Sequence, residues 1–454
     1  MTKKINRELS SFRDPSGYVY YDNQKVYRRV NKVYFKEYDY FIKSGLYDEL
    51  KNNGYIVGLK EVNRTSNYID LEVDTIPFIS YPYEWSFDEY KDAAILTLSI
   101  EEIALKYGMT LKDATSYNVQ FLDGKPIFID ILSFIFYKDG DPWGAYGQFV
   151  RHFICPIVLM SSVDIHLNSL MRNYIDGIPL DVCSNILGHR GGFFAYQHIK
   201  LHNKTIIKND NNTDVRKVYI KKNSLLNMIF MMKNGISNLK IKDTITEWDN
   251  YYNNTNYDSE AFKSKSSIVD KFLKYINLNK NDIIWDLGAN DGKYSIIASK
   301  YSNVIAFDID VNAVNRNYLN NKNGNNNILP LVLDLFNPSP SIGFDLKERK
   351  SINERGGAGC IMALALIHHL SISNNTSFSM IALSFSKLSK YLIIEFVPKN
   401  DSKVKRLLST REDIFPNYNE EEFEKSFEKY YKIVKKEKVK DSFRVIYLME
   451  SIYE

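Results

Sequence analysis

The protein has 454 residues, of which 44% are hydrophobic and 25% charged, and its formal net charge is +4. This composition is typical of globular proteins and excludes collagen, coiled coils and intrinsic disorder, while the length predicts two or three domains. So small a net charge demands neither nucleic acid nor an anionic membrane as a partner.

The sequence predicts a cytoplasmic protein without a membrane span. Its longest apolar runs, Phe153–Met160 and Cys360–Ile367, are far shorter than the roughly 18 residues that a spanning helix needs. The basic N-terminus is not followed by an apolar segment, so a signal peptide is not expected. The three cysteines, Cys155, Cys183 and Cys360, are widely spaced, which argues against a disulfide scaffold or a zinc ribbon.

A first block predicts an α+β domain over residues 1–202. Two β-rich runs around the polar turn Asp22–Gln24 predict a hairpin. Apolar residues at helical spacing predict helices over 34–52 and 86–107, with a strand at Ile69–Val73 between them. Residues 203–256 are rich in Asn and Lys, and we interpret them as a connector with one helix or hairpin of its own.

A second block, residues 257–454, alternates strands with helices. A helix over 260–276 leads to the strand Ile283–Trp285, and further strands are expected at 303–307, 328–332, 360–365 and 391–396. This alternation predicts an α/β fold with a doubly wound, mostly parallel, Rossmann-like sheet. In the tail we expect a charged helix over Glu420–Lys436 and a terminal strand over Ser442–Met449 that could join the sheet edge.

Acidic residues end three successive strands of this block: Asp286, Asp308 and Asp334. The first lies in the loop Asp286–Gly292, whose glycines allow a ligand to approach the backbone and which opens a helix. An acid at this position repels phosphate but suits an ammonium or a sulfonium. A carboxylate at the end of the second strand can accept both hydroxyls of a ribose. Single acids of this kind often only cap turns, but three in succession favour a nucleoside-type cofactor.

With these motifs, residues 257–454 resemble the class I S-adenosylmethionine-dependent methyltransferases, whose first motif is D/E-x-G-x-x-x-G. The resemblance implies that Asp286, Gly288 and Gly292 hold the methionine part of S-adenosylmethionine and that Asp308 holds the ribose. It also implies that Asp334, with Leu335, flanks the adenine. The loop has Asn290 where the commonest form has glycine.

Three residues at other strand ends are candidates for catalysis: His368, His369 and Glu395. A neutral imidazole can take a proton from a hydroxyl or amine, although adjacent side chains diverge, so at most one histidine is expected to face the acceptor. Either histidine could instead pack against the adenine or cap a turn. Glu395 could orient an acceptor or pair with His369, or it could form an ion pair with Arg411. Tyr257 and Lys265 could help to close the cofactor pocket. No metal site is expected.

The first block carries a second resemblance. Asp113 and Asn118 are followed by a hairpin and then Asp130, as in the catalytic and metal-binding loops of the protein-kinase-like fold, with aminoglycoside phosphotransferases as the nearest comparison. There the first Asp positions a hydroxyl, and the Asn and second Asp hold magnesium against ATP. This sequence departs from that pattern because no histidine precedes Asp113, no clear strand lysine is present, and Ile-Leu-Ser follows Asp130.

Three hypotheses follow. The first is a methyltransferase acting on oxygen or nitrogen of a small molecule or glycan precursor, with the first block recruiting the acceptor. The second is a bifunctional kinase and methyltransferase, and the third is a binding module in which both sites have decayed. A nucleic-acid substrate is not expected, because the sequence shows no basic stripe with interleaved stacking aromatics, and the Lys-rich run Lys432–Lys440 is more simply explained as a solvated helix face.

Overall fold

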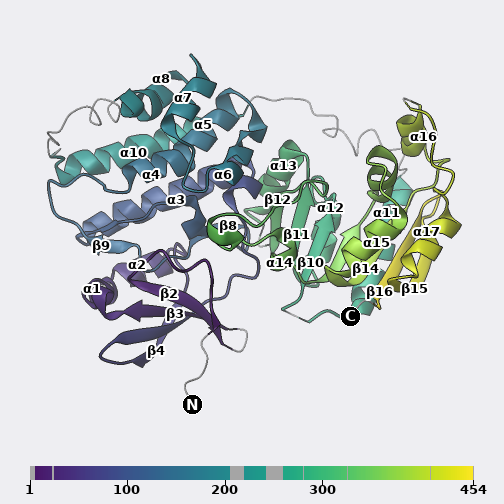
Figure 1. Ribbon diagram of the computed structural model, residues 1–454, viewed down its shortest axis with the longest axis horizontal. Helices are drawn as coiled ribbons and strands as arrows, with labels where there is room; N and C mark the ends of the chain where they lie inside the picture. Colours follow the sequence, from purple (N-terminus) through teal and green to yellow (C-terminus); the bar gives the residue numbers. More distant parts are fainter. Residues whose placement is uncertain are drawn as a thin grey trace. The chain divides into compact units, whose positions relative to one another are not determined.

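The computed structural model describes residues 6–22, 25–204, 219–241, 259–279, 281–324, 326–409 and 411–452. The chain forms two compact units (Figure 1). The first comprises Met1–Thr244 together with Pro340–Ser351, and the second comprises Ile245–Ser339 together with Ile352–Glu454.

The first unit begins with an antiparallel sheet of five strands in the order β1-β2-β3-β5-β4. These strands are β1 (Asn6–Arg7), β2 (Gly17–Asp22), β3 (Lys25–Asn31), β4 (Leu59–Arg64) and β5 (Tyr68–Val73). The hairpin predicted around the turn after Asp22 is β2–β3. The helix predicted over 34–52 is divided into α1 (Phe35–Lys43) and α2 (Leu46–Asn52), because Gly45 has a left-handed φ of 88° between them.

The rest of the first unit is mainly helical. The long helix α3 (Phe87–Lys106) begins with a capping box in which Glu89 accepts the backbone N–H of Ser86. Two small antiparallel pairs follow it: β6 (Met109–Leu111) with β9 (Phe134–Phe136), and β7 (Val119–Leu122) with β8 (Lys125–Phe128). The remaining helices are α4 (Tyr146–Phe149), α5 (Cys155–Ser162), α6 (Leu170–Asn173), α7 (Leu180–Leu187), α8 (Gly192–Ala195) and α10 (Lys222–Asn238).

Helix α10 lies in the stretch that we interpreted as a connector. Its apolar residues recur at helical spacing and are buried: Leu225, Ile229, Met232 and Ile236. The helix packs against α3, so these residues belong to the core of the first unit.

The second unit contains a seven-stranded sheet in the order β12-β11-β10-β13-β14-β16-β15. The strands are β10 (Ile283–Leu287), β11 (Asn303–Asp308), β12 (Ile328–Val332), β13 (Ala358–Ala363), β14 (Ser389–Phe396), β15 (Tyr431–Lys438) and β16 (Val445–Ser451). Neighbours from β12 to β14 pair in parallel, and β16 is antiparallel to both β14 and β15. This is the strand order of the class I methyltransferase fold, so the predicted α/β fold is confirmed.

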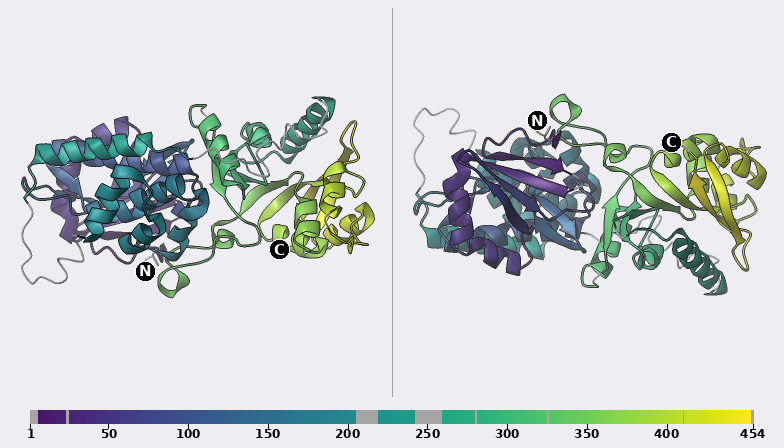
Figure 2. Two further views of the ribbon diagram at one scale, coloured as in Figure 1. Left: turned by 90° about the horizontal axis from the view of Figure 1, so that it is seen from above. Right: turned by 90° about the horizontal axis from the view of Figure 1, so that it is seen from below.

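Helices cover both faces of this sheet (Figure 2). They are α11 (Ser259–Ile276), α12 (Lys293–Ala298), α13 (Val311–Asn321), α14 (Ile352–Arg355), α15 (Phe378–Ser386), α16 (Ser402–Leu408) and α17 (Glu420–Phe427). Alternate residues of the strands, such as Ile284 and Met362, join α11 and α12 in one buried cluster. On the opposite face, Phe396 and Tyr447 contact Phe423 of α17 at ring distances of 5.1 and 5.2 Å. Burial on both faces explains why these strands are almost continuously apolar.

The tail differs from the prediction. The helix predicted over 420–436 ends at Phe427, and the Lys-rich run forms strand β15 instead of a helix face. Alternation explains the difference, because Tyr431 is buried whereas Lys432 is exposed. The terminal strand β16 lies inside the sheet, between β14 and β15, so β15 and not β16 forms the edge.

The segment 340–351 lies between β12 and β13 in the sequence, yet it belongs to the first unit. The carboxylate of Glu348 accepts hydrogen bonds from the guanidinium of Arg13, one of them at 3.0 Å. The ammonium of Lys350 pairs with Glu8 at 2.8 Å. We refer to residues 340–351 as the inserted segment.

Candidate functional site

The loop after β10 is built from left-handed residues. Positive φ angles occur at Gly288 (73°), Asn290 (50°) and Gly292 (82°). Glycine adopts such angles without strain, and asparagine tolerates them better than most residues, which explains why Asn290 can replace the usual glycine. Asp286 at the end of β10 accepts a hydrogen bond of 2.6 Å from the hydroxyl of Ser295 in α12, so its carboxylate is fixed in orientation.

Gly292 has a packing role in this loop. It is the N-cap residue of α12, and a Cβ atom placed on it would lie 2.4 Å from the side-chain oxygen of Asn317. Any larger residue would therefore have to displace the side chain of Asn317 in α13.

The second strand-end acid, Asp308, is oriented by two backbone N–H groups. One oxygen accepts from Asn290 at 2.7 Å and the other accepts from Asp310 at 2.9 Å. The left-handed turn at Asn290 thus connects the first loop directly to the second acid. Burial raises the pKa of Asp308 to about 6, against the opposing effect of these two hydrogen bonds.

Asp286, Asp308 and Asp334 line one cavity of about 300 Å³. Its wall also includes Lys265, Gly288, Asn290, Leu366 and His369. The three acids come from the ends of β10, β11 and β12, which are adjacent in the sheet, so the parallel order brings them together. Gly292, His368 and Glu395 are not among the lining residues.

Burial disfavours the charged forms of both Asp286 and Lys265, and each of the two groups counteracts this effect on the other. Asp286 is 2% exposed, and burial raises its pKa to about 6 although Ser295 and Lys265 act in the other direction. Burial lowers the pKa of Lys265, although its partner Glu395 and the nearby Asp286 counteract this. The cavity thus presents a carboxylate and an ammonium close to each other at the loop after β10.

The two adjacent histidine rings do not diverge as expected: their centroids lie 4.1 Å apart, although only His369 is among the residues that line the cavity. His369 lines the cavity, and burial lowers its pKa to about 4, with Arg444 and Lys403 adding to the effect. His369 is therefore neutral near pH 7, as a proton acceptor must be. His368 is fully buried, and neither of its ring nitrogens has a hydrogen-bond partner.

Glu395 is buried in a charge network. One oxygen accepts from the ammonium of Lys265 and from the backbone N–H of Ala365, both at 2.6 Å. Its other oxygen lies 3.5 Å from Arg444. The expected alternative partner Arg411 instead donates to the carbonyl of Ile372. Because Ala365 has a left-handed φ of 53° and lines the cavity, Glu395 holds part of the cavity wall in place.

The cavity has lining residues that the sequence analysis did not name: Ile309, Phe336, Ser373 and Asn374. Ile309 and Phe336 follow Asp308 and Asp334 within two residues, so extending the search past each strand end would have found both. Ser373 ends the π-helical turn His369–Ser373 and Asn374 follows it, and the sequence has no comparable signal for this turn. Tyr257 lies outside the described residues.

In the first unit, Asp130 is held by neighbouring side chains. One of its oxygens pairs with Arg28 of β3, and the other accepts from the hydroxyl of Ser133. Although burial alone would raise the pKa of Asp130, Arg28 and Ser133 keep it below its ordinary value. Burial raises the pKa of Asp113, the nearby carboxylate of Asp130 adds to this effect, and the side chain of Asn118 counteracts it. Arg28 of β3 is therefore the cation that neutralises Asp130.

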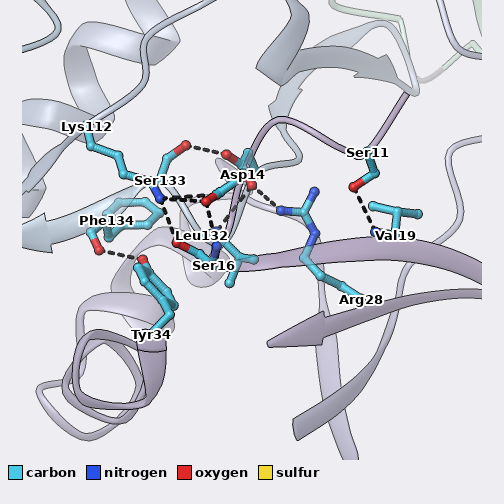
Figure 3. A network of polar contacts seen from close by, with 11 residues as sticks. Ser11, Asp14, Ser16, Val19, Arg28, Tyr34, Lys112, Leu132, Ser133 and Phe134 are labelled. Carbon is cyan, nitrogen blue, oxygen red and sulfur yellow. Dashed lines mark hydrogen bonds and ion pairs between the residues drawn. The ribbon is translucent and has the colours of Figure 1, made fainter. Parts of the chain in front are cut away.

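A second group of polar contacts lies beside this one (Figure 3). The ammonium of Lys112 contacts Asp14 at 3.1 Å and the hydroxyl of Ser16 at 3.0 Å. Asp14 and Ser16 belong to the turn before β2, and Lys112 immediately precedes Asp113 in the chain. These contacts fasten the turn to the loop that carries Asp113.

Within the part of the chain that the structure describes, no helix has the length and apolar character needed to cross a membrane. In the same part, no three His, Cys, Asp or Glu side chains are grouped in a way that could hold a metal ion.

The chain is similar to a known protein along almost its whole length. The nodulation protein NoeA of Rhizobium meliloti (strain 1021) is 32% identical over 463 aligned residues, which cover 98% of this chain and 96% of that protein. No family model matches.

Solved structures of methyltransferases, among them the following two, are partly similar to this chain. The magnesium protoporphyrin IX methyltransferase ChlM from Synechocystis PCC 6803, with bound SAH, has a TM-score of 0.31 at 16% identity and covers 45% of this chain and 92% of its own. The N-methyltransferase NodS from Bradyrhizobium japonicum WM9 has a TM-score of 0.31 at 8% identity. The match covers 43% of this chain and 99% of NodS.

Proposed function

This chain belongs to the family of the nodulation protein NoeA, and from the site described above we propose that it is a methyltransferase whose methyl donor is S-adenosylmethionine. The observation that carries the proposal is that Asp286, Asp308 and Asp334 line one cavity at the ends of three adjacent parallel strands. Ligands of open α/β sheets bind outside the carboxyl ends of the strands, where this cavity lies.

The residues present fit this donor. The carboxylate of Asp308 is already oriented by two backbone N–H groups, and its free lone pairs can accept the ribose hydroxyls. Asp334, with the exposed Phe336 two residues later, suits an adenine, which offers an amine and an apolar face. Asp286 suits the ammonium of the methionine part. Gly288 contributes no side chain to the cavity, so the backbone can approach the ligand.

S-adenosylmethionine, when bound, supplies a methyl group activated by a sulfonium. The protein then has to align the acceptor and remove its proton. His369 is the lining residue best suited to the second task, because it is neutral near pH 7 and reaches the cavity. A hydroxyl or amine acceptor is therefore favoured, and a small molecule or glycan precursor is the acceptor class that we propose.

The first unit has the role of recruiting the acceptor in this proposal. The guanidinium of Arg28 already neutralises Asp130 and would repel a magnesium ion there, which supports a binding role over magnesium-dependent phosphoryl transfer. The alternative is a bifunctional enzyme, which requires Asp113, Asn118 and Asp130 to bind magnesium and ATP. Magnesium-dependent ATP turnover that is lost in Asp113→Ala would establish this alternative.

Calorimetric titration with S-adenosylhomocysteine tests the proposal. We expect saturable binding to the full chain and at least tenfold weaker binding to Asp308→Ala, because the variant loses an ionised acceptor for two hydroxyls. Glu412→Ala is a suitable control, since Glu412 is an exposed carboxylate outside the cavity. Absence of heat with both S-adenosylmethionine and S-adenosylhomocysteine would refute the proposed function.

A further inference from the structure

In the first unit, α8 and the π-helical turn Tyr196–Leu201 that continues it carry apolar residues on both faces. One face, with Ala195 and Ile199, is buried in the core of the unit. The other face carries Phe193, which is 78% exposed, together with Tyr196 and Leu201, which are also exposed. The outward face of a surface helix is ordinarily polar, so core packing does not explain these residues.

Helix α10 adds two more exposed apolar side chains. Phe230 and Met231 lie on the side opposite its buried residues and are 61% and 63% exposed. Met231 shares one side of the helix with Gly235, which is four residues further on. The ring of Phe194 lies against Gly235, since a Cβ atom added there would be 2.3 Å from the Phe194 Cε2 atom. This contact joins α8 to α10 (Figure 1). We refer to five exposed residues as the apolar patch: Phe193, Tyr196, Leu201, Phe230 and Met231.

The two segments that carry the apolar patch are strongly basic. Residues 182–204 and 219–241 contain no Asp or Glu, although the whole chain has 55 of them. The same residues contain seven lysines and arginines: Arg190, Lys200, Lys204, Lys221, Lys222, Lys233 and Lys240. Lys233 pairs with Glu102 at 3.1 Å, and the other six form no ion pair within the described part of the chain. The net charge of the whole chain is only +4, so positive charge is concentrated beside the apolar patch.

Exposed apolar side chains among unpaired cations fit the surface of an anionic lipid bilayer. Phe, Leu and Met side chains enter the boundary between headgroups and acyl chains, while the lysines contact anionic headgroups. A protein partner fits less well, because lysine is depleted in protein interfaces. A nucleic acid would use the lysines but would leave Leu201 and Met231 exposed, since neither has an aromatic ring on which a base could stack.

We propose that the first unit docks on anionic lipid bilayers through the apolar patch and the basic residues around it. The bilayer receives the exposed apolar side chains, and its negative surface potential attracts the lysines. This inference goes beyond the proposed methyl transfer and does not depend on it.

Co-sedimentation of the full chain with lipid vesicles tests the docking. Vesicles of phosphatidylcholine with about 30 mol% phosphatidylglycerol should bind the protein at least tenfold more tightly than vesicles of phosphatidylcholine alone, because each basic side chain near an anionic surface adds to the affinity. Raising the salt concentration should weaken this binding, since salt screens exposed charges.

Two double variants separate the apolar and the electrostatic contributions. Phe193→Ser combined with Phe230→Ser should weaken binding to the anionic vesicles at least tenfold, because less apolar surface leaves water. Phe443→Ser is the matched control that should leave binding unchanged, as Phe443 is also 61% exposed but belongs to the second unit. Lys204→Gln combined with Lys221→Gln should weaken binding about tenfold at low salt and less at high salt.

Three results with the vesicles would overturn the proposal: no binding to anionic vesicles, equal binding to neutral ones, or binding that the double serine variant leaves unchanged. Analytical ultracentrifugation tests whether a second copy of the chain covers the apolar patch instead. A dimer that forms in the unmodified protein and is abolished in the double serine variant would also overturn it. Binding of S-adenosylhomocysteine should be the same in all these variants, so failure of the docking leaves the proposed function untouched.

Discussion

Replacing Asp286 by asparagine should make the protein more stable and at the same time weaken its binding of S-adenosylhomocysteine. The side chain is 2% exposed, and burial raises its pKa from the ordinary 3.8 to about 6. At neutral pH the protein therefore holds an ionised carboxylate in a place that disfavours the charge. Asparagine has nearly the same shape and can still accept the hydroxyl of Ser295, but it carries no charge.

The size of the effect follows from the pKa. A carboxyl whose pKa is raised from 3.8 to about 6 lowers the free energy of unfolding by about 3 kcal/mol once both states are ionised. Between these two values the folded state binds more protons than the unfolded state, so stability falls as the pH rises. Above about pH 6 the penalty is complete, and below about pH 4 it is absent. Asp286→Asn should therefore be about 2–3 kcal/mol more stable than the unmodified protein at pH 7.5, which corresponds to a rise in melting temperature of about 5–10 °C.

Thermal unfolding at pH 7.5 and pH 4 measures the predicted difference. The gain of Asp286→Asn should be present at the higher pH and small at the lower one. Glu412→Gln removes an exposed carboxylate and serves as a control that should show no gain at either pH. Calorimetry at pH 7.5 should show binding of S-adenosylhomocysteine weakened at least tenfold in Asp286→Asn. A variant that is no more stable than the unmodified protein, or that binds the ligand equally well, would refute the reasoning.

Two further predictions concern other parts of the molecule. His369→Ala should reduce the rate of methyl transfer about 100-fold, since a general base acts on the acceptor. The dissociation constant of S-adenosylhomocysteine should change less than about threefold. A parallel loss of ligand binding would contradict this role. Glu348→Ala should make the inserted segment more susceptible to limited proteolysis, because it loses both the pair with Arg13 and the acceptor for the N–H of Phe344 at 2.9 Å. Lys347→Ala is a control, as Lys347 is exposed, and equal cleavage of both variants would contradict the prediction.

The fold of the second unit could be predicted because its signals are local. Continuous apolar strands followed by helices imply a parallel sheet, and in a parallel sheet the residues after successive strands share one edge. The three acids could therefore be placed together without knowing any distance. The conformation of Asn290 is also a local property, because its left-handed φ explains why glycine is commoner at this position.

Other features depend on contacts between residues far apart in the sequence. The partner of Glu395 is Lys265, 130 residues earlier, and the sequence offered Arg411 as an equally reasonable partner. The Lys-rich run was interpreted as a helix because its charges dominate the pattern. Among the described residues its strand β15 pairs with β16 alone, and an edge strand tolerates lysines at exposed positions.

The inserted segment is the feature that the sequence concealed most completely, and it affects how the protein should be studied. Leu333 and Phe336 line the cavity, and the chain enters the first unit at Pro340. A short covalent path therefore joins the proposed adenine end of the cavity to the unit that we propose recruits the acceptor. A truncated protein beginning at residue 257 would keep the segment but lose its partners Arg13 and Glu8. Glu348 would then keep a buried carboxylate without the guanidinium of Arg13. Affinities measured on such a fragment would describe a protein whose inserted segment has lost these contacts, so the full chain is the appropriate protein for the binding experiments.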